Sequence, residues 1–152
     1  MPKIPLSDWQ RDEGHHDATG EELGPSFYKL VTHPAGCTKM GAYLERLPPG
    51  SRSGAAHRHS DEDEFIFVLQ GRVTLWEDGV ETELEAGSAA VWAASSTDHH
   101  RLQNDTNEDA VYLVVGSRAA RDFVDFAEHD FRLEIDRRSG ELIRRKHPKG
   151  AD

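Results

Sequence analysis

Hydrophobic and polar residues alternate in short runs from Ser26 onward, and turn-forming residues separate almost every run from the next. The runs that we predict as strands cover residues 27–31, 39–47, 64–69, 73–77, 80–85, 88–92, 99–103 and 110–116. Short strands at regular spacing, with no long amphipathic helix between them, are typical of a sandwich or a barrel. The pattern therefore predicts an all-β domain.

Three regions follow from this pattern. Residues 1–25 are polar and interrupted by Pro and Gly, so we expect a solvated arm that could also order against a partner subunit. Residues 26–126 hold the barrel strands, and within them Asp78-Gly79 predicts a tight hairpin because Gly readily takes a positive φ. Residues 127–152 are predicted to form a hairpin and a tail outside the barrel, as an added edge or a dimer arm.

Composition narrows the function classes. The chain has 152 residues, 36% hydrophobic and 30% charged, and a net charge of −10, which suits one globular domain. Because so acidic a protein does not attract phosphate, we expect no nucleic-acid partner. No apolar stretch is long enough for a membrane span, and the first residues lack the apolar core of a signal peptide. We therefore expect no membrane partner and a cytoplasmic location. Cys37 is the single cysteine, which excludes a disulfide framework.

Three histidines and one glutamate are the most informative residues. His57 and His59 are two positions apart in an extended segment, so their side chains lie on one face. Glu64 begins the next strand, on a face that otherwise continues with aliphatic residues, and His100 lies on a later strand. Burying a carboxylate is costly unless its charge is compensated. We therefore predict one divalent metal ion held by His57, His59, Glu64 and His100, with His99 facing outward.

The spacing of these residues resembles the two motifs of the cupin superfamily. The first motif, His-x-His followed by Glu and then Gly, is matched by His57, His59, Glu64 and Gly71, with Gly50 one residue earlier than in the family pattern. The resemblance covers about residues 38–117. It implies a double-stranded β-helix, which is a jelly-roll barrel, and pairing through outer strands into a homodimer.

The second cupin motif is matched at its ends. Gly87, His100 and Asn104 occupy the expected positions, whereas Ala93 and Ser95 stand where the family has Pro and Gly. The span from Gly87 to His100 is longer than in the family pattern, and the extra residues lie in the segment 95–98. This departure concerns the loop beside the expected metal rather than the ligand set.

Three imidazoles and one carboxylate suit Fe, Mn, Ni, Co or Zn as divalent ions, and do not suit Ca²⁺ or Cu⁺. Four protein ligands leave one or two coordination positions open for a small-molecule ligand, dioxygen or water. We therefore expect a small-molecule enzyme: an oxygenase first, and an isomerase, epimerase or lyase next. The alternative is a non-catalytic module that binds or senses a sugar or metabolite.

Six other side chains could serve such a site, and each also has an ordinary structural explanation. Tyr43 and Asp98 could transfer protons, or could be a packing residue and a solvated loop carboxylate. Four residues could contact substrate, or could belong to the surface and the core: Arg46, Gln70, Trp92 and Arg101. The acidic residues 61–63 that precede Glu64 are expected to form a solvated turn.

Overall fold

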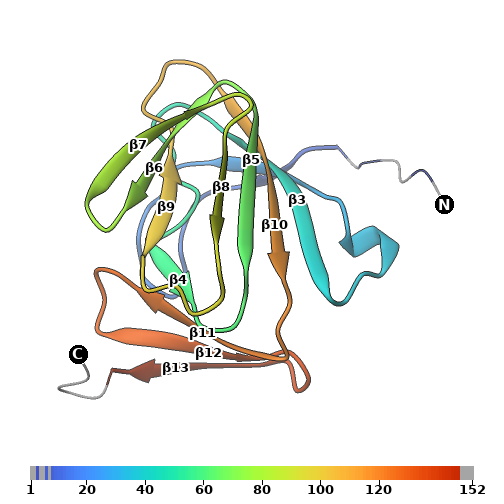
Figure 1. The fold of residues 1–152 in the computed structure, drawn as a ribbon, viewed down its shortest axis with the longest axis vertical. Helices are drawn as coiled ribbons and strands as arrows, with labels where there is room; N and C mark the ends of the chain where they lie inside the picture. Colours follow the sequence, from blue (N-terminus) through green and yellow to red (C-terminus); the bar gives the residue numbers. More distant parts are fainter. Residues whose placement is uncertain (1–2, 4–5, 7, 148–152) are drawn as a thin grey trace.

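The computed structural model describes residues 3, 6 and 8–147, and two antiparallel sheets make up nearly all of it (Figure 1). In order across the first sheet, the strands are β1 (Gln10–Asp12), β2 (Ser26–Leu30), β3 (Met40–Leu47), β10 (Ala110–Ser117), β5 (Glu64–Gln70) and β8 (Ala89–Trp92). In order across the second sheet, they are β13 (Glu141–Lys146), β12 (Phe131–Asp136), β11 (Arg121–Phe126), β4 (His57–His59), β9 (His100–Gln103), β6 (Arg72–Glu77) and β7 (Val80–Glu85). The predicted all-β, double-stranded β-helix fold is confirmed.

The remaining regular element in the described part of the chain is a short 3-10 turn, η1 (His33–Ala35). No helix among the described residues has the length and apolar character needed to cross a membrane.

The core lies between the two sheets and explains the period-two pattern. On β3 and β10, alternate residues point inward, and Leu47, Ala110 and Tyr112 are fully buried. Ile66 and Val68 on β5 meet them from the neighbouring strand of the same sheet. The same alternation also turns some polar side chains of β4, β5 and β9 toward the interior, and these side chains form the site described below.

Two glycine positions require a positive φ. In the hairpin between β6 and β7, Asp78 has a φ of 43° and Gly79 a φ of 89°, as a two-residue turn of the predicted tight type demands. Gly71 has a φ of 73°, and a Cβ there would lie 2.6 Å from the carbonyl oxygen of Asp109. The glycine that ends the first motif is therefore required by backbone geometry at the turn after β5.

The C-terminal strands extend the barrel rather than standing apart from it. β11 pairs with β4 on one side and with β12 on the other, and β13 forms the edge of the sheet. The sequence pattern did not predict β11, because charged residues at Arg121, Asp122 and Asp125 obscure its alternation. Residues 148–152 of the predicted tail lie outside the described residues.

The N-terminal arm packs on the barrel. β1 pairs with β2, Leu23 is buried, and its carbonyl oxygen accepts a hydrogen bond from the backbone N–H of Arg52. Part of the predicted arm is therefore in contact with the barrel, while the residues of β1 stay exposed. Residues 1–2, 4–5 and 7 of the arm lie outside the described residues.

Candidate metal centre and cavity

β4 lies between β11 and β9 in the second sheet and carries two of the four predicted ligands. His57 and His59 project from the same face of this short strand, and His57 is in register with His100 on β9. Glu64 begins β5 in the opposite sheet. The closure of the two sheets therefore brings residues from three strands to one place inside the barrel.

The four side chains converge on the Glu64 carboxylate. Its Oε2 atom lies 3.1 Å from His100 Nε2, 3.8 Å from His59 Nε2 and 4.0 Å from His57 Nε2. The ligand atoms of His57, His59 and Glu64 all lie within 4.8 Å of one another. Donor atoms at these separations can surround one cation.

The other ring nitrogen of two histidines is already engaged. His57 Nδ1 lies 2.8 Å from the carbonyl oxygen of Ala55, and His59 Nδ1 lies 2.6 Å from Asp122 Oδ2. A carbonyl or a carboxylate can only accept, so Nδ1 carries the proton in both rings and each Nε2 presents its lone pair to the cluster. In metal-binding proteins, hydrogen bonds at the ring nitrogen that does not bind the metal fix the orientation of the ligand histidines.

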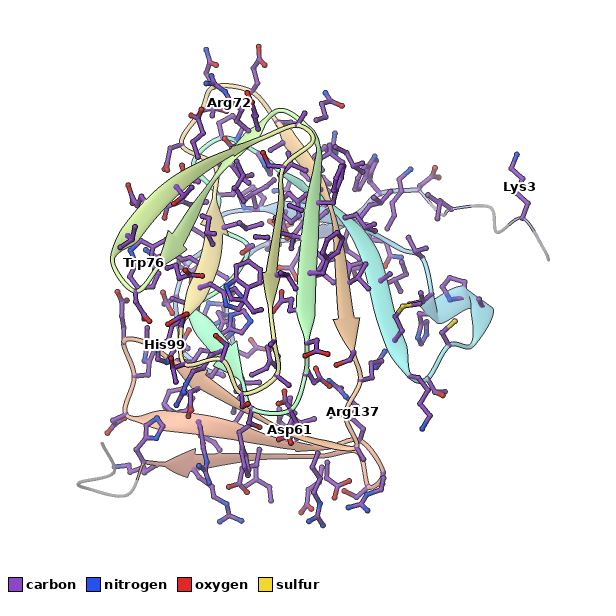
Figure 2. The ribbon with its side chains drawn as sticks, in the orientation of Figure 1. Lys3, Asp61, Arg72, Trp76, His99 and Arg137 are labelled. Carbon is purple, nitrogen blue, oxygen red and sulfur yellow. The ribbon has the colours of Figure 1, made fainter. Side chains whose placement is uncertain are left out.

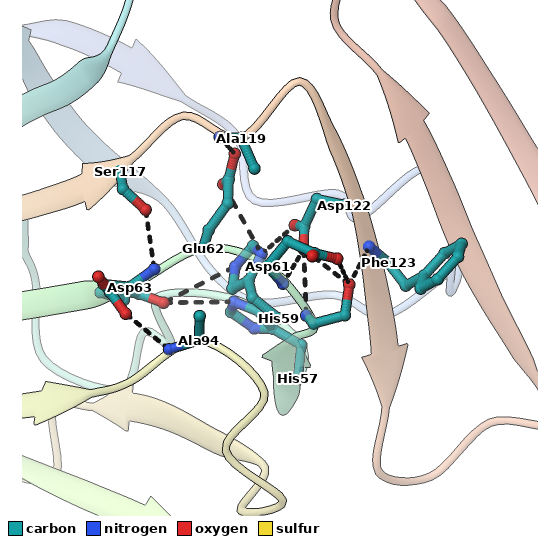
Figure 3. A network of polar contacts seen from close by, with 12 residues as sticks. His57, His59, Asp61, Glu62, Asp63, Ala94, Ser117, Ala119, Asp122 and Phe123 are labelled. Carbon is teal, nitrogen blue, oxygen red and sulfur yellow. Dashed lines mark hydrogen bonds and ion pairs between the residues drawn. The ribbon is translucent and has the colours of Figure 1, made fainter.

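Asp122 is the carboxylate that holds His59 from outside the cluster (Figure 3). It is only 1% exposed, and its Oδ1 accepts hydrogen bonds from the backbone N–H groups of Ser60 and Asp61, at 3.1 and 3.0 Å. These donors offset the burial of the carboxylate and, together with His59, hold the pKa of Asp122 below its usual value. Asp122 therefore stays charged beside the imidazole that it orients.

His100 is fixed by packing. Its ring stacks on the indole of Trp92 with a centroid separation of 3.7 Å and an angle of 8° between the planes. The Trp92 Nε1–H in turn donates to Glu77 Oε2 at 2.7 Å. Both side chains are buried, so the ring of His100 has little freedom to turn away from Glu64.

The protonation states suit a cation. Burial lowers the pKa of His57 to about 4, so its imidazole is neutral at pH 7. Burial opposes ionisation of Glu64, but the hydrogen bond from His100 and the neighbouring imidazoles outweigh it and lower the pKa to about 2. Burial lowers the pKa of His59, but its hydrogen bond to Asp122 and the nearby carboxylates outweigh burial and raise the pKa above its usual value, so a metal ion would displace a proton from this ring. Imidazole nitrogens beside a carboxylate are the donor set that divalent transition metals prefer. These residues therefore fit the predicted metal ion.

The cluster faces a cavity of about 310 Å³ inside the barrel. Its walls include the four predicted ligands, and Tyr43, Glu45 and Tyr112 contribute polar groups from β3 and β10. Arg118 and Arg137 line it as well. Figure 2 places Arg137, with Asp61, at the end of the barrel next to the C-terminal strands, opposite Arg72. The volume is within the range of small-molecule sites.

Residues 43–116 match the family model of the cupin domain. The whole structure is similar to a sugar phosphate isomerase of the cupin superfamily from Silicibacter pomeroyi, with 27% identity, a TM-score of 0.81, and 99% of this chain and 98% of the other covered. The chain belongs to the cupin superfamily. No curated protein matches the sequence of this cupin.

Two further solved structures share the cupin fold. One, from Acidithiobacillus ferrooxidans, is provisionally described as a sugar phosphate isomerase; it has 28% identity and a TM-score of 0.75, with 80% of this chain and 76% of the other covered. The other, from Thermotoga maritima, is predicted to be an oxalate decarboxylase; it has 22% identity and a TM-score of 0.55, with 63% and 83% covered. The similarity to the Thermotoga maritima structure concerns the fold alone.

The two adjacent histidines of this cupin take opposite sides of β9. His100 is buried in the cluster, whereas His99 Nδ1 lies 3.2 Å from Asp78 Oδ1 on the outer side of the barrel (Figure 2). The motif asparagine, Asn104, is fully buried, and its side-chain amide donates to the carbonyl oxygens of Leu47 and Glu108. Asn104 therefore ties two loops together rather than facing the cavity.

The other predicted site residues of the cupin divide into two groups. Tyr43 and Trp92 line the cavity. Arg46 does not, because its guanidinium lies 4.3 Å from the ring centroid of Phe27 on the outer side of β3.

Gln70 and Arg101 also lie away from the cavity. Gln70 is exposed at the end of β5, and Arg101 lies over the ring of Trp76 at 4.6 Å. The placement of these two residues and of Arg46 favours their ordinary structural explanations. Asp98 is exposed in the loop between β8 and β9, and it lines a narrow pocket together with His59, Glu64 and His100. Its role stays a prediction.

Glu62 departs from the expected solvated turn. Asp61 and Asp63 are exposed, but Glu62 is 7% exposed and accepts a hydrogen bond from the backbone N–H of Ala119 (Figure 3). It also accepts hydrogen bonds from the Arg137 guanidinium. Its Oε2 also lies 3.8 Å from His59 Nδ1. The turn is thus tied to the C-terminal strands, through a partner that no local sequence pattern could indicate.

Glu45 is a further polar residue of the cavity that was not predicted from the sequence. It shares the inward face of β3 with Tyr43 and Leu47, and it is 6% exposed. The available signal was a carboxylate at an inward position of an alternating strand, which is the same signal that pointed to Glu64.

Proposed function

We propose that this cupin is a metal-dependent isomerase that interconverts aldose and ketose forms of a phosphorylated sugar. The observation that carries the proposal is the cluster of His57, His59, Glu64 and His100 on the wall of a cavity of about 310 Å³. The end-to-end similarity to a sugar phosphate isomerase supports this choice among metal-dependent reactions. The oxygenase expectation stays a prediction with no separate support.

The residues present suit this chemistry. A divalent ion, when bound, would polarise the carbonyl and hydroxyl oxygens of the substrate as a Lewis acid. The protein's own part is to hold the four ligands by the contacts of Asp122, Ala55 and Trp92, and to limit water through the enclosing sheets. Isomerisation conserves atoms and electrons, so no oxidant or second substrate is needed.

Basic residues near the cavity suit an anionic end of the substrate. Arg118 is exposed and lies against Gly41, where a Cβ would come within 3.7 Å of the Arg118 side chain. Arg137 lines the same cavity and is held by Glu62. On a chain with a net charge of −10, two guanidinium groups at one cavity favour a phosphate or carboxylate group there.

The first test is metal content and isomerisation by the same preparations. We expect about one transition-metal ion per chain in the wild type, retained in His99→Ala and lost in His100→Ala. These two variants are matched, because they remove neighbouring histidines, of which His100 begins β9 inside the barrel and His99 precedes it on the outer side. Activity should be assayed on ribose 5-phosphate, arabinose 5-phosphate and glucose 6-phosphate, and it should follow metal content.

Two results would count against the proposal. Metal-loaded protein that binds a sugar phosphate without converting it would favour the alternative of a non-catalytic binding module. Equal metal content in His100→Ala and wild type would contradict the ligand set.

We also propose that the protein is a homodimer, as the family resemblance suggests. The edge strand β13 exposes Leu142, which is 62% accessible, and is one surface available to a second copy. Light scattering should give about twice 17.0 kDa, and a mass near 17.0 kDa would contradict the dimer.

A further inference from the structure

A buried carboxyl group lies in the cavity in addition to the metal ligands. Glu45 on β3 is in register with Tyr112 on β10, and both side chains point into the barrel. The Tyr112 hydroxyl donates a hydrogen bond of 2.9 Å to Glu45 Oε2. Glu45 also lines a second cavity, of about 320 Å³, under the N-terminal arm. It therefore stands between the metal cavity and the covered side of the barrel.

No positive charge compensates this carboxyl group. Within the described part of the chain, no Lys, Arg or His forms an ion pair with Glu45. Burial raises its pKa from 4.5 to about 7, because the loss of hydration outweighs the hydrogen bonds from Tyr112 and Ser26. The titratable and charged groups around it come from β1, β2, β3, β5, β10, the arm and the segment after β3: Asp12, Tyr28, Tyr43, Glu64, Tyr112, His15, His16 and Arg52.

The other carboxylates on the metal cavity, and its tyrosines, are engaged or unsuited. Glu62 is bound by Arg137 and a backbone N–H, and Asp63 accepts a hydrogen bond from the backbone N–H of Ala94. Burial raises the pKa of Tyr43 and Tyr112 well above 10, so neither phenol ionises near neutral pH. Among the cavity carboxylates outside the metal cluster, Glu45 is left to exchange a proton near pH 7.

We propose that Glu45 is the catalytic base of this cupin and carries a proton between two neighbouring carbons of a hydroxy-carbonyl substrate. The assignment rests on the proposed isomerase function. The carboxylate takes the proton from the carbon that bears the hydroxyl group. The C–H electron pair then forms the C=C bond of an enediolate, and the C=O pair moves to oxygen. Glu45 returns the proton to the former carbonyl carbon, while the hydroxyl proton passes to the other oxygen, so that nothing is gained or lost.

The test compares Glu45→Gln with the wild type, using metal-loaded protein and the three aldose phosphates in D₂O. Turnover and the loss of the substrate C2–H signal are followed by proton NMR after removal of the metal. We expect kcat to fall at least about 100-fold, the usual contribution of a general base, with unchanged metal content and a cooperative unfolding transition. Glu85→Gln, the same change at an exposed position of β7, should have no effect.

The outcomes separate the two proposals. A wild type that neither converts nor exchanges any of the three substrates refutes the isomerase function, and the role of Glu45 with it. An active wild type with Glu45→Gln within about fivefold of it refutes the role of Glu45 alone.

A second variant covers the case in which Glu45→Gln fails to fold. Tyr112→Phe keeps the ring but removes the hydrogen bond that favours the charged carboxylate. The rise of kcat with pH should therefore move to higher pH in Tyr112→Phe. If activity falls without any movement of that pH profile, Glu45 is not the base.

Discussion

The buried carboxyl of Glu45 predicts a measurable loss of stability as the pH rises. Its pKa is about 7 in the folded protein and 4.5 when it is hydrated. Between these values the unfolded chain has released the proton and the folded chain retains it, so stability falls with increasing pH. The contribution is fully present below about pH 4.5 and is lost above about pH 7. The difference between the two pKa values corresponds to about 3 kcal/mol.

Glu45→Gln should remove this component, because Gln does not ionise. The assay is urea unfolding of metal-free protein at pH 5 and pH 7.5, where the titration covers about 2–3 kcal/mol. The wild type should lose that much more stability than Glu45→Gln between the two pH values. Glu85→Gln should behave as the wild type, because Glu85 is exposed. If Glu45→Gln and wild type show the same pH dependence within about 0.5 kcal/mol, the carboxyl is not desolvated as the structure indicates.

Three further predictions concern the metal centre and the motif residues. Asp122→Asn should weaken metal binding by about 10–100-fold in a competition titration, since it loses the charge that orients His59, whereas Asp125→Asn on the same strand should not. Gly71→Ala should destabilise the protein by more than about 2 kcal/mol in urea unfolding, because its Cβ would meet the Asp109 carbonyl. Gly79→Ala has open space and should cost only about 1 kcal/mol; equal costs would contradict the clash. Asn104→Ala should lower stability by about 2–3 kcal/mol and leave metal affinity unchanged, and an altered affinity would show that Asn104 also acts on the site.

Much of the fold followed from local patterns. Alternation along β3, β5, β6 and β10 marked the strands, because each has one face in the core and one toward solvent. Asp78-Gly79 marked a hairpin because few residue pairs tolerate its dihedral angles. β11 escaped prediction because Asp122 and Val124 both point inward, so that its buried face is not uniformly apolar.

Part of the arrangement of the site could be predicted from the local sequence pattern. The spacing of His57, His59 and Glu64 was sufficient to predict a shared face and a metal, because residues two apart in a strand point the same way. Alternation also separated His100 from His99. These inferences use only the backbone period and the cost of burying charge, which are local properties of the chain.

Tertiary structure alone decided which groups support and complete that site. Asp122 meets His59 because β11 pairs with β4, and Arg137 reaches Glu62 because β12 continues the same sheet. Glu45 becomes a buried acid only when β10 and the N-terminal arm close over β3. A pKa depends on the surrounding dielectric and on distant partners, and these exist only after the chain has folded. Local patterning was enough to predict most of the strands and the four side chains that converge, because it depends only on backbone period and the cost of burying charge. The closed barrel set the hydration and orientation of these side chains and placed the buried acid beside them.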